Sequence, residues 1–245
     1  MPEQPHSGGF ADQLGTVIST ISSPPTWWLL LITGLLAVFI RFAGRWFWQA
    51  NVLTTIVHEA AHALVSLLCG GGVRQIMITS PDSGVCMYRW MVTRGEAMVR
   101  SFAGYAMPAL AGLGCAALLS NGYASWVLFA GALVMLAVLL VVRDGVSLLV
   151  VLIVGALFAT VLWWGPLWLH LGLASLVMWL LLIGEIPGVW DLVRDRFSSE
   201  VAFETDDAWS LYCNTGLPAP VWFAAWYGVI GWCCWEAFWL LWPVA

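Results

Sequence analysis

The chain has 245 residues, of which 61% are hydrophobic and only 9% are charged, and its formal net charge is −5. Soluble domains carry about 25% charged residues, so this composition excludes a soluble globular protein. The net negative charge and the lack of a basic tract also exclude a nucleic-acid binder. The remaining class is a multi-pass membrane protein that sits in a lipid bilayer.

The first 26 residues are polar and carry neither a basic start nor a cleavage signal, so we expect no cleavable signal peptide. Residues 10–22 can form a short surface helix. A single transmembrane domain then extends over residues 27–245. Apolar runs of membrane length occur in it near 27–43, 51–69, 100–120, 125–142, 146–164, 167–187 and 220–242. The predicted fold is an all-α polytopic membrane protein with about six to seven transmembrane helices.

Two segments of this domain do not have the composition of a span. Residues 73–92 alternate apolar and polar positions on either side of a Ser, Pro, Asp and Gly turn, which predicts a short β-hairpin. Residues 191–217 hold eight of the 23 charged residues, which predicts a hydrophilic loop before the last span. We detect no internal repeat in the sequence.

The most informative motif is H-E-x-x-H, formed by His58, Glu59 and His62. Positions i and i+4 lie on one face of a helix, so both imidazoles can bind one metal ion. Glu59 stands beside the first ligand, where it can act as a general base toward a water that the metal activates. The spacing therefore predicts a zinc site in the second span.

The competing interpretation is that these histidines only pack inside an apolar helix. Two observations count against it. The chain has four His, and two of them fall in this motif. Glu59 is one of very few acidic residues inside an apolar run, where an ionisable group is costly and commonly functional.

A catalytic zinc takes three protein ligands, so a third must come from elsewhere in the chain. Asp144 is the first choice, because it lies between two apolar runs with almost no loop. An ion pair with Arg143 at a tight turn is the alternative role for Asp144. The other candidate ligands are Asp191, Asp206, Asp207, Glu185 and His170, of which Asp207 is second in rank and His170 is expected to be structural.

These motifs resemble the site-2 protease family of intramembrane zinc metalloproteases, and most closely its peptidase M50B-like branch. The resemblance spans roughly residues 50–226. It rests on the H-E-x-x-H helix, a following hairpin, and several short elements: Phe102-Ala103-Gly104-Tyr105-Ala106-Met107-Pro108, Asp144-Gly145, Trp190-Asp191, Thr205-Asp206-Asp207-Ala208, Thr215-Gly216-Leu217-Pro218 and Trp222. The resemblance implies that Asp144 completes the zinc site. The Asn and Pro that usually precede the family's Asp-Gly are replaced here by an apolar run.

The resemblance implies peptide-bond hydrolysis of membrane protein substrates, with Zn²⁺ held by His58, His62 and Asp144 and with Glu59 as the catalytic base. It also suggests a single-span regulatory protein as substrate and a bacterial cell membrane as the location. The hairpin can offer a strand edge to an extended substrate. Two other functions stay open at this stage, a metal-binding scaffold that cleaves nothing and, with less support, a small transporter.

Overall fold

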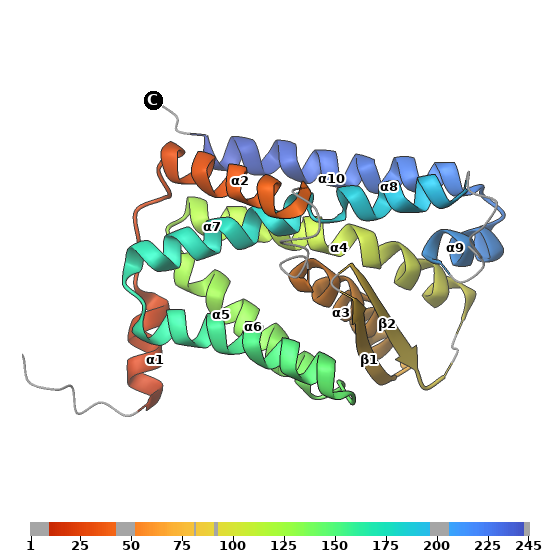
Figure 1. Ribbon diagram of the computed structural model, residues 1–245, viewed down its shortest axis with the longest axis horizontal. Coiled ribbons are helices and arrows are strands. Elements are labelled where there is room, and N and C mark those ends of the chain that lie inside the picture. The colour runs from red at the N-terminus through yellow and green to blue at the C-terminus, as the bar shows by residue number, and fades with distance from the viewer. Residues whose placement is uncertain (1–9, 43–51, 81, 91–92, 197–205, 243–245) are drawn as a thin grey trace, which may run out of the picture.

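The computed structural model describes residues 10–42, 52–80, 82–90, 93–196 and 206–242. Within these residues the chain forms ten helices and one hairpin (Figure 1). They are α1 (Phe10–Ser19), α2 (Trp27–Phe42), α3 (Val52–Leu68), β1 (Val73–Ser80), β2 (Ser83–Tyr88), α4 (Arg94–Ser120), α5 (Ala124–Leu139), α6 (Gly145–Trp164), α7 (Leu167–Ile183), α8 (Glu185–Arg196), α9 (Asp207–Thr215) and α10 (Ala219–Leu241). The prediction of a helical protein with a hairpin after the H-E-x-x-H helix is confirmed.

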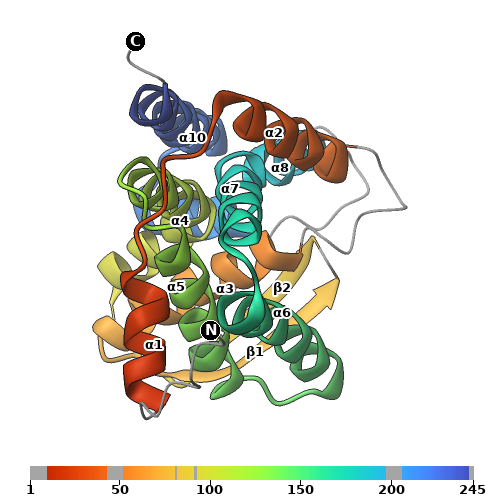
Figure 2. The ribbon, with the colours of Figure 1, turned by 90° about the vertical axis from the view of Figure 1, so that its left-hand side faces the viewer.

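Helix α4 is at the centre of the packing and contacts α3, α7, α9 and α10 (Figures 1 and 2). Its buried face consists largely of small residues, among them Ala103, Gly104 and Gly112. Small residues allow helix backbones to approach closely inside a membrane. A Cβ atom at Gly112 would lie only 2.9 Å from the backbone nitrogen of Leu182 in α7. The sequence of α4 therefore sets how closely its neighbours can lie.

Three helical stretches are long and apolar enough to cross a membrane, namely α4, α6 and the stretch of α7 and α8 together. The pair α9–α10, which is bent by 118°, makes a fourth if it is counted as one span. Helices α2, α3 and α5 are apolar but have only 16, 17 and 16 residues. By length and hydropathy the described residues supply three or four spans, and six to seven remains a prediction.

Helix α5 ends earlier than the sequence predicts because the following residues join the hairpin. The backbone N–H of Ile76 in β1 donates to the carbonyl of Val141 at 3.2 Å, and Ile76 also forms a parallel bridge with Val142. The N–H of Ile78 donates to the hydroxyl of Ser147 in α6 at 2.7 Å. The outer edge of β1 is therefore occupied by the α5–α6 connection, which fixes the hairpin against the helices.

The expectation of a hydrophilic loop over 191–217 is wrong for the part that the structure describes. Residues up to Arg196 continue α8, and residues Asp207–Thr215 form α9. Asp206 is the N-cap of α9, with its side chain accepting the N–H of Trp209, and Gly216 ends the helix at a φ of 76°. An Asp before a helix and a left-handed Gly after it are strong helix start and stop signals. The many charged residues in this segment nevertheless favoured a loop in the sequence-based prediction.

Candidate metal centre

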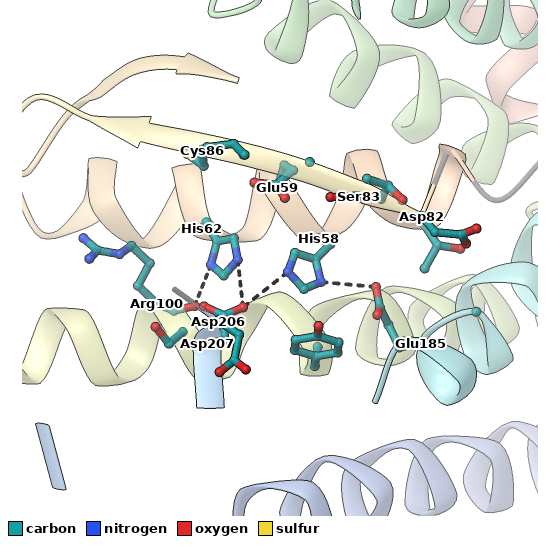
Figure 3. Close-up of a pocket in the computed structure, with 18 of the residues that line it drawn as sticks. His58, Glu59, His62, Asp82, Ser83, Cys86, Arg100, Glu185, Asp206 and Asp207 are labelled. Atoms are coloured by element: carbon teal, nitrogen blue, oxygen red, sulfur yellow. Dashed lines mark hydrogen bonds and ion pairs between the residues drawn. The ribbon is translucent and has the colours of Figure 1, made fainter. Parts of the chain in front are cut away.

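Helix α3 presents His58 and His62 on one face, one turn apart, as the motif predicts. Their ring centroids are 4.7 Å apart with an interplanar angle of 78°. The helix is largely buried, and it packs against α4 and both strands of the hairpin. The two imidazoles therefore lie inside the molecule, at the junction of α3 with α4 and α9 (Figure 3).

Asp207, the first residue of α9, lies against both histidines. Its Oδ2 atom is 3.4 Å from Nε2 of His58 and 3.3 Å from Nε2 of His62. These three residues are the group of possible metal ligands in the described part of the chain, with ligand atoms within 4.8 Å of one another. Figure 3 shows their side chains converging from two helices that are far apart in sequence.

The Nδ1 atoms of the two histidines have hydrogen-bond partners on the side of each ring away from Asp207. Nδ1 of His62 lies 2.9 Å from the backbone carbonyl of Arg100 in α4. Nδ1 of His58 lies 3.3 Å from Oε1 of Glu185 in α8. A histidine whose Nδ1–H is bonded to an acceptor presents the lone pair of Nε2, so both Nε2 atoms face the same point beside Asp207.

Gly104 makes room for this arrangement on α4. A Cβ atom at this position would lie 2.6 Å from Nε2 of His58 and 2.6 Å from Cε1 of His62. Any larger residue would therefore occupy the space between the donor atoms. This gives a physical reason for a small residue at the Ala103-Gly104 element of the family resemblance.

Glu59 lies between α3 and β2 and is only 4% exposed. Its Oε2 is buried and has no hydrogen-bond partner among the described residues. Strand β2 passes very close to it, since a Cβ at Gly84 would lie 2.5 Å from Cγ of Glu59. An orphaned buried carboxylate is costly unless another group binds it.

The donor set fits zinc. Two imidazole nitrogens and one carboxylate oxygen are typical ligands of a catalytic zinc site, which keeps its fourth position open. Ligand atoms at about 2.0–2.2 Å from a tetrahedral ion lie about 3.3–3.6 Å from one another, and both Nε2 to Oδ2 distances agree with this, at 3.3 and 3.4 Å. The unpartnered oxygen of Glu59 stands beside this donor set.

Asp144, the first choice of ligand from sequence, is not brought to the histidines. It is the N-cap of α6, and its Oδ1 accepts the backbone N–H of Ser147 at 2.9 Å. This hydrogen bond from Ser147 lowers the pKa of the Asp144 carboxyl below its ordinary value. The correction has a simple cause: an Asp followed by Gly and an apolar run is also the signature of a helix N-terminus.

The remaining candidate ligands have other roles or positions. Asp206 caps α9 and binds Arg196, and Asp191 is exposed on α8. His170 bonds to the hydroxyl of Ser125 at 2.9 Å and to the carbonyl of Val161 at 2.8 Å, so it links α5, α6 and α7 as a structural residue. Among the elements of the resemblance, Thr205 lies outside the described residues.

The histidines and Glu59 line a cavity of about 560 Å³, a volume within the usual range of ligand-binding pockets. Arg41 of α2 stands at this cavity, with an ion pair to Asp82 of the hairpin at 3.2 Å and a hydrogen bond from Nε to the carbonyl of Gly184 at 2.8 Å. Sequence reasoning did not find this contact, because its three partners are far apart in the chain.

Residues 28–237 match the family described as Peptidase M50B-like. The chain belongs to this family. The matched range contains the three clustered residues and Glu59, and the family description implies a peptidase. Comparison with curated proteins and with solved structures gives no match.

Proposed function

We propose that the protein is an intramembrane zinc metalloprotease, in which His58, His62 and Asp207 hold the metal and Glu59 is the general base. The observation that carries the proposal is the convergence of both Nε2 atoms on one oxygen of Asp207. It occurs beside an orphaned carboxylate, inside a member of a peptidase family. Asp207 replaces Asp144 in this proposal because Asp207, and not Asp144, belongs to the group of possible ligands that lie together in the described residues.

Zinc, when bound, supplies a Lewis acid that polarises a peptide carbonyl and lowers the pKa of water to about 7. Glu59 stands one residue from the first ligand, and its free Oε2 accepts the proton of the attacking water. The same carboxyl then gives the proton to the leaving amide nitrogen. Burial beneath β2 keeps Glu59 away from bulk water, so that its proton is shared only with groups in the cavity.

A helical substrate must become extended before its peptide bond can be attacked, and the hairpin offers a strand edge for this. The edge cannot be β1, because Ile76 and Ile78 already donate to Val141 and Ser147. The pairing of β1 with β2 turns the backbone groups of Gly84, Cys86 and Tyr88 away from β1. These residues line the cavity, so an extended chain can pair with β2 beside Glu59.

The proposed substrate class and location draw on the apolar helices and on the family resemblance. The long apolar helices support a multi-pass membrane protein, and the proposed substrate is a membrane protein, such as a single-span regulatory protein. We place the enzyme in a bacterial cell membrane. The scaffold alternative loses its motivation, because the altered sequence around Asp144 no longer concerns the proposed ligand set. The transporter alternative stays without support, because the sequence has no internal repeat.

The test is a comparison of zinc content and cleavage of a single-span membrane protein in three purified forms. Wild type should contain zinc and cleave. Glu59→Gln should keep the zinc but lose at least about 10²-fold in cleavage rate, because the base is absent. His58→Ala should lose both zinc and cleavage. Full zinc content in His58→Ala, or normal cleavage by Glu59→Gln, would refute the proposal.

A further inference from the structure

Glu185 is a second buried carboxylate at the histidines, and the proposed mechanism does not use it. It is 6% exposed, and its Oε1 lies 3.3 Å from Nδ1 of His58. It is the first residue of α8, where the helical path of α7 is interrupted. Pro187 accounts for the interruption, since it has no N–H to donate to the carbonyl of Ile183. Glu185 lines the cavity.

The geometry excludes Glu185 as a ligand of the same ion as His62 and Asp207. The two nitrogens of an imidazole point to opposite sides of the ring. Asp207 lies at Nε2 of His58, whereas Glu185 lies at Nδ1. Glu185 is accordingly absent from the group of ligand atoms that lie together in the described residues. Its carboxylate therefore acts on His58 itself.

Two neighbours hold the His58 ring and Glu185 in this relation. The ring of Tyr105 meets the His58 ring edge-on at 4.6 Å. Gly188, one turn along α8, leaves room for the carboxylate, since a Cβ there would lie 3.1 Å from Oε2 of Glu185. The pair is therefore enclosed by α4 and α8, and it is not a chance surface contact.

We propose that Glu185 is a positioning residue that accepts the Nδ1–H of His58 and so holds Nε2 toward the donor point beside Asp207. This inference rests on the proposed function. A carboxylate behind a metal-binding histidine fixes its tautomer and makes it a stronger donor. His62 relies instead on a neutral backbone carbonyl, that of Arg100. The two histidines thus differ, and only His58 depends on a side chain that mutation can remove.

The experiment measures the zinc Kd by chelator competition for wild type, Glu185→Ala and Glu185→Gln. The control is Asp191→Asn, which removes an exposed carboxylate from the same helix. Glu185→Ala should raise the Kd by about 10–100-fold. Glu185→Gln keeps an acceptor oxygen without the charge, so its Kd should lie between those of wild type and Glu185→Ala. Asp191→Asn should match wild type.

A second readout separates positioning from a general loss of structure. In the Co²⁺-loaded proteins, the visible absorption bands should shift in both Glu185 variants and stay unchanged in Asp191→Asn. If Glu185→Ala has the same zinc Kd and the same Co²⁺ spectrum as wild type, the inference is overturned. The proposed function still stands in that case, provided that the wild-type protein binds zinc. If Glu185→Ala cannot be purified in folded form, a wild-type Kd in Glu185→Gln overturns the inference. Failure of wild type to bind zinc overturns both.

Discussion

Arg196 at the end of α8 donates from one Nη2 to both carboxylate oxygens of Asp206, at 2.6 and 2.8 Å. Asp206 is at the same time the N-cap of α9, and it immediately precedes Asp207. The ion pair therefore ties the start of α9 to α8 at the residue next to the proposed ligand. The hydroxyls of Ser101 and Ser210, which bond at 2.9 Å, attach the same helix to α4.

Arg196→Ala should weaken zinc binding without touching a ligand, because Asp206 loses its partner and α9 loses its attachment to α8. We expect a loss of stability of about 1.5–3 kcal/mol, as for a hydrogen bond to a charged group. Zinc content and thermal unfolding check this. Arg194→Ala, an exposed arginine two residues earlier, is the control and should behave as wild type. Equal zinc content in both variants would contradict the role given to Arg196.

Gly104→Ala should abolish zinc binding, because the new Cβ would lie 2.6 Å from Nε2 of His58. The matched control is Gly114→Ala on the same helix, where a Cβ meets nothing within 4 Å. That variant should bind zinc as wild type does. If both variants bind zinc equally well, the close approach of α4 to the histidines is not required.

Asp144→Ala should keep its zinc and lose stability instead, since Asp144 caps α6 and does not reach the histidines. Loss of an N-cap costs about 1 kcal/mol. Zinc content and unfolding temperature distinguish the two roles of this residue. Loss of zinc from an otherwise folded Asp144→Ala protein would return Asp144 to the ligand set.

The Asp144 cap should make the stability of the folded protein depend on pH, with lower stability in acid. The pKa of Asp144 is lowered from 3.8 by the hydrogen bond from Ser147, so the ionised carboxylate favours the folded state. Its contribution is present above the unfolded pKa and disappears as the pH falls through the lowered folded pKa. Asp144→Asn keeps the cap without the charge. Wild type should be the more stable at neutral pH, and the difference in unfolding temperature should shrink below about pH 4 and vanish once the pH lies below the lowered folded pKa.

If an extended substrate pairs with the outer edge of β2, removing a backbone N–H from that edge should impair cleavage. Cys86→Pro removes an N–H that faces away from β1, so cleavage of a membrane substrate should fall while zinc content stays unchanged. Cys86→Ala keeps this N–H and should cleave normally. If the two variants cleave at the same rate, an extended substrate does not pair with β2 at this residue.

Local patterns predicted the parts of the site that are close in sequence. His58, Glu59 and His62 follow from helical spacing, and the hairpin follows from alternation around a turn. Local patterns did not single out the third candidate ligand. Asp207 is far from the histidines in sequence, and it reaches them only through the packing of α9 on α4. Asp144 was preferred since a helix N-cap and a ligand both place Asp before an apolar run.

The sequence contains the signals for helix α9, although the prediction for this segment is a loop. Asp206 before the helix and Gly216 after it are ordinary capping signals, and the charged residues around them outweighed these signals in the prediction. The contacts of Glu185 with His58 and of Arg41 with Asp82 had no local signal. Each joins residues from separate elements, so each required the fold.

The proposed function depends above all on Asp207 completing a zinc site with His58 and His62. The most direct measurement is the zinc content of purified Asp207→Ala beside the Glu59→Gln protein, which keeps every proposed ligand. We expect stoichiometric zinc in Glu59→Gln and loss of zinc from Asp207→Ala, with both proteins folded. Stoichiometric zinc of unchanged affinity in Asp207→Ala would contradict it.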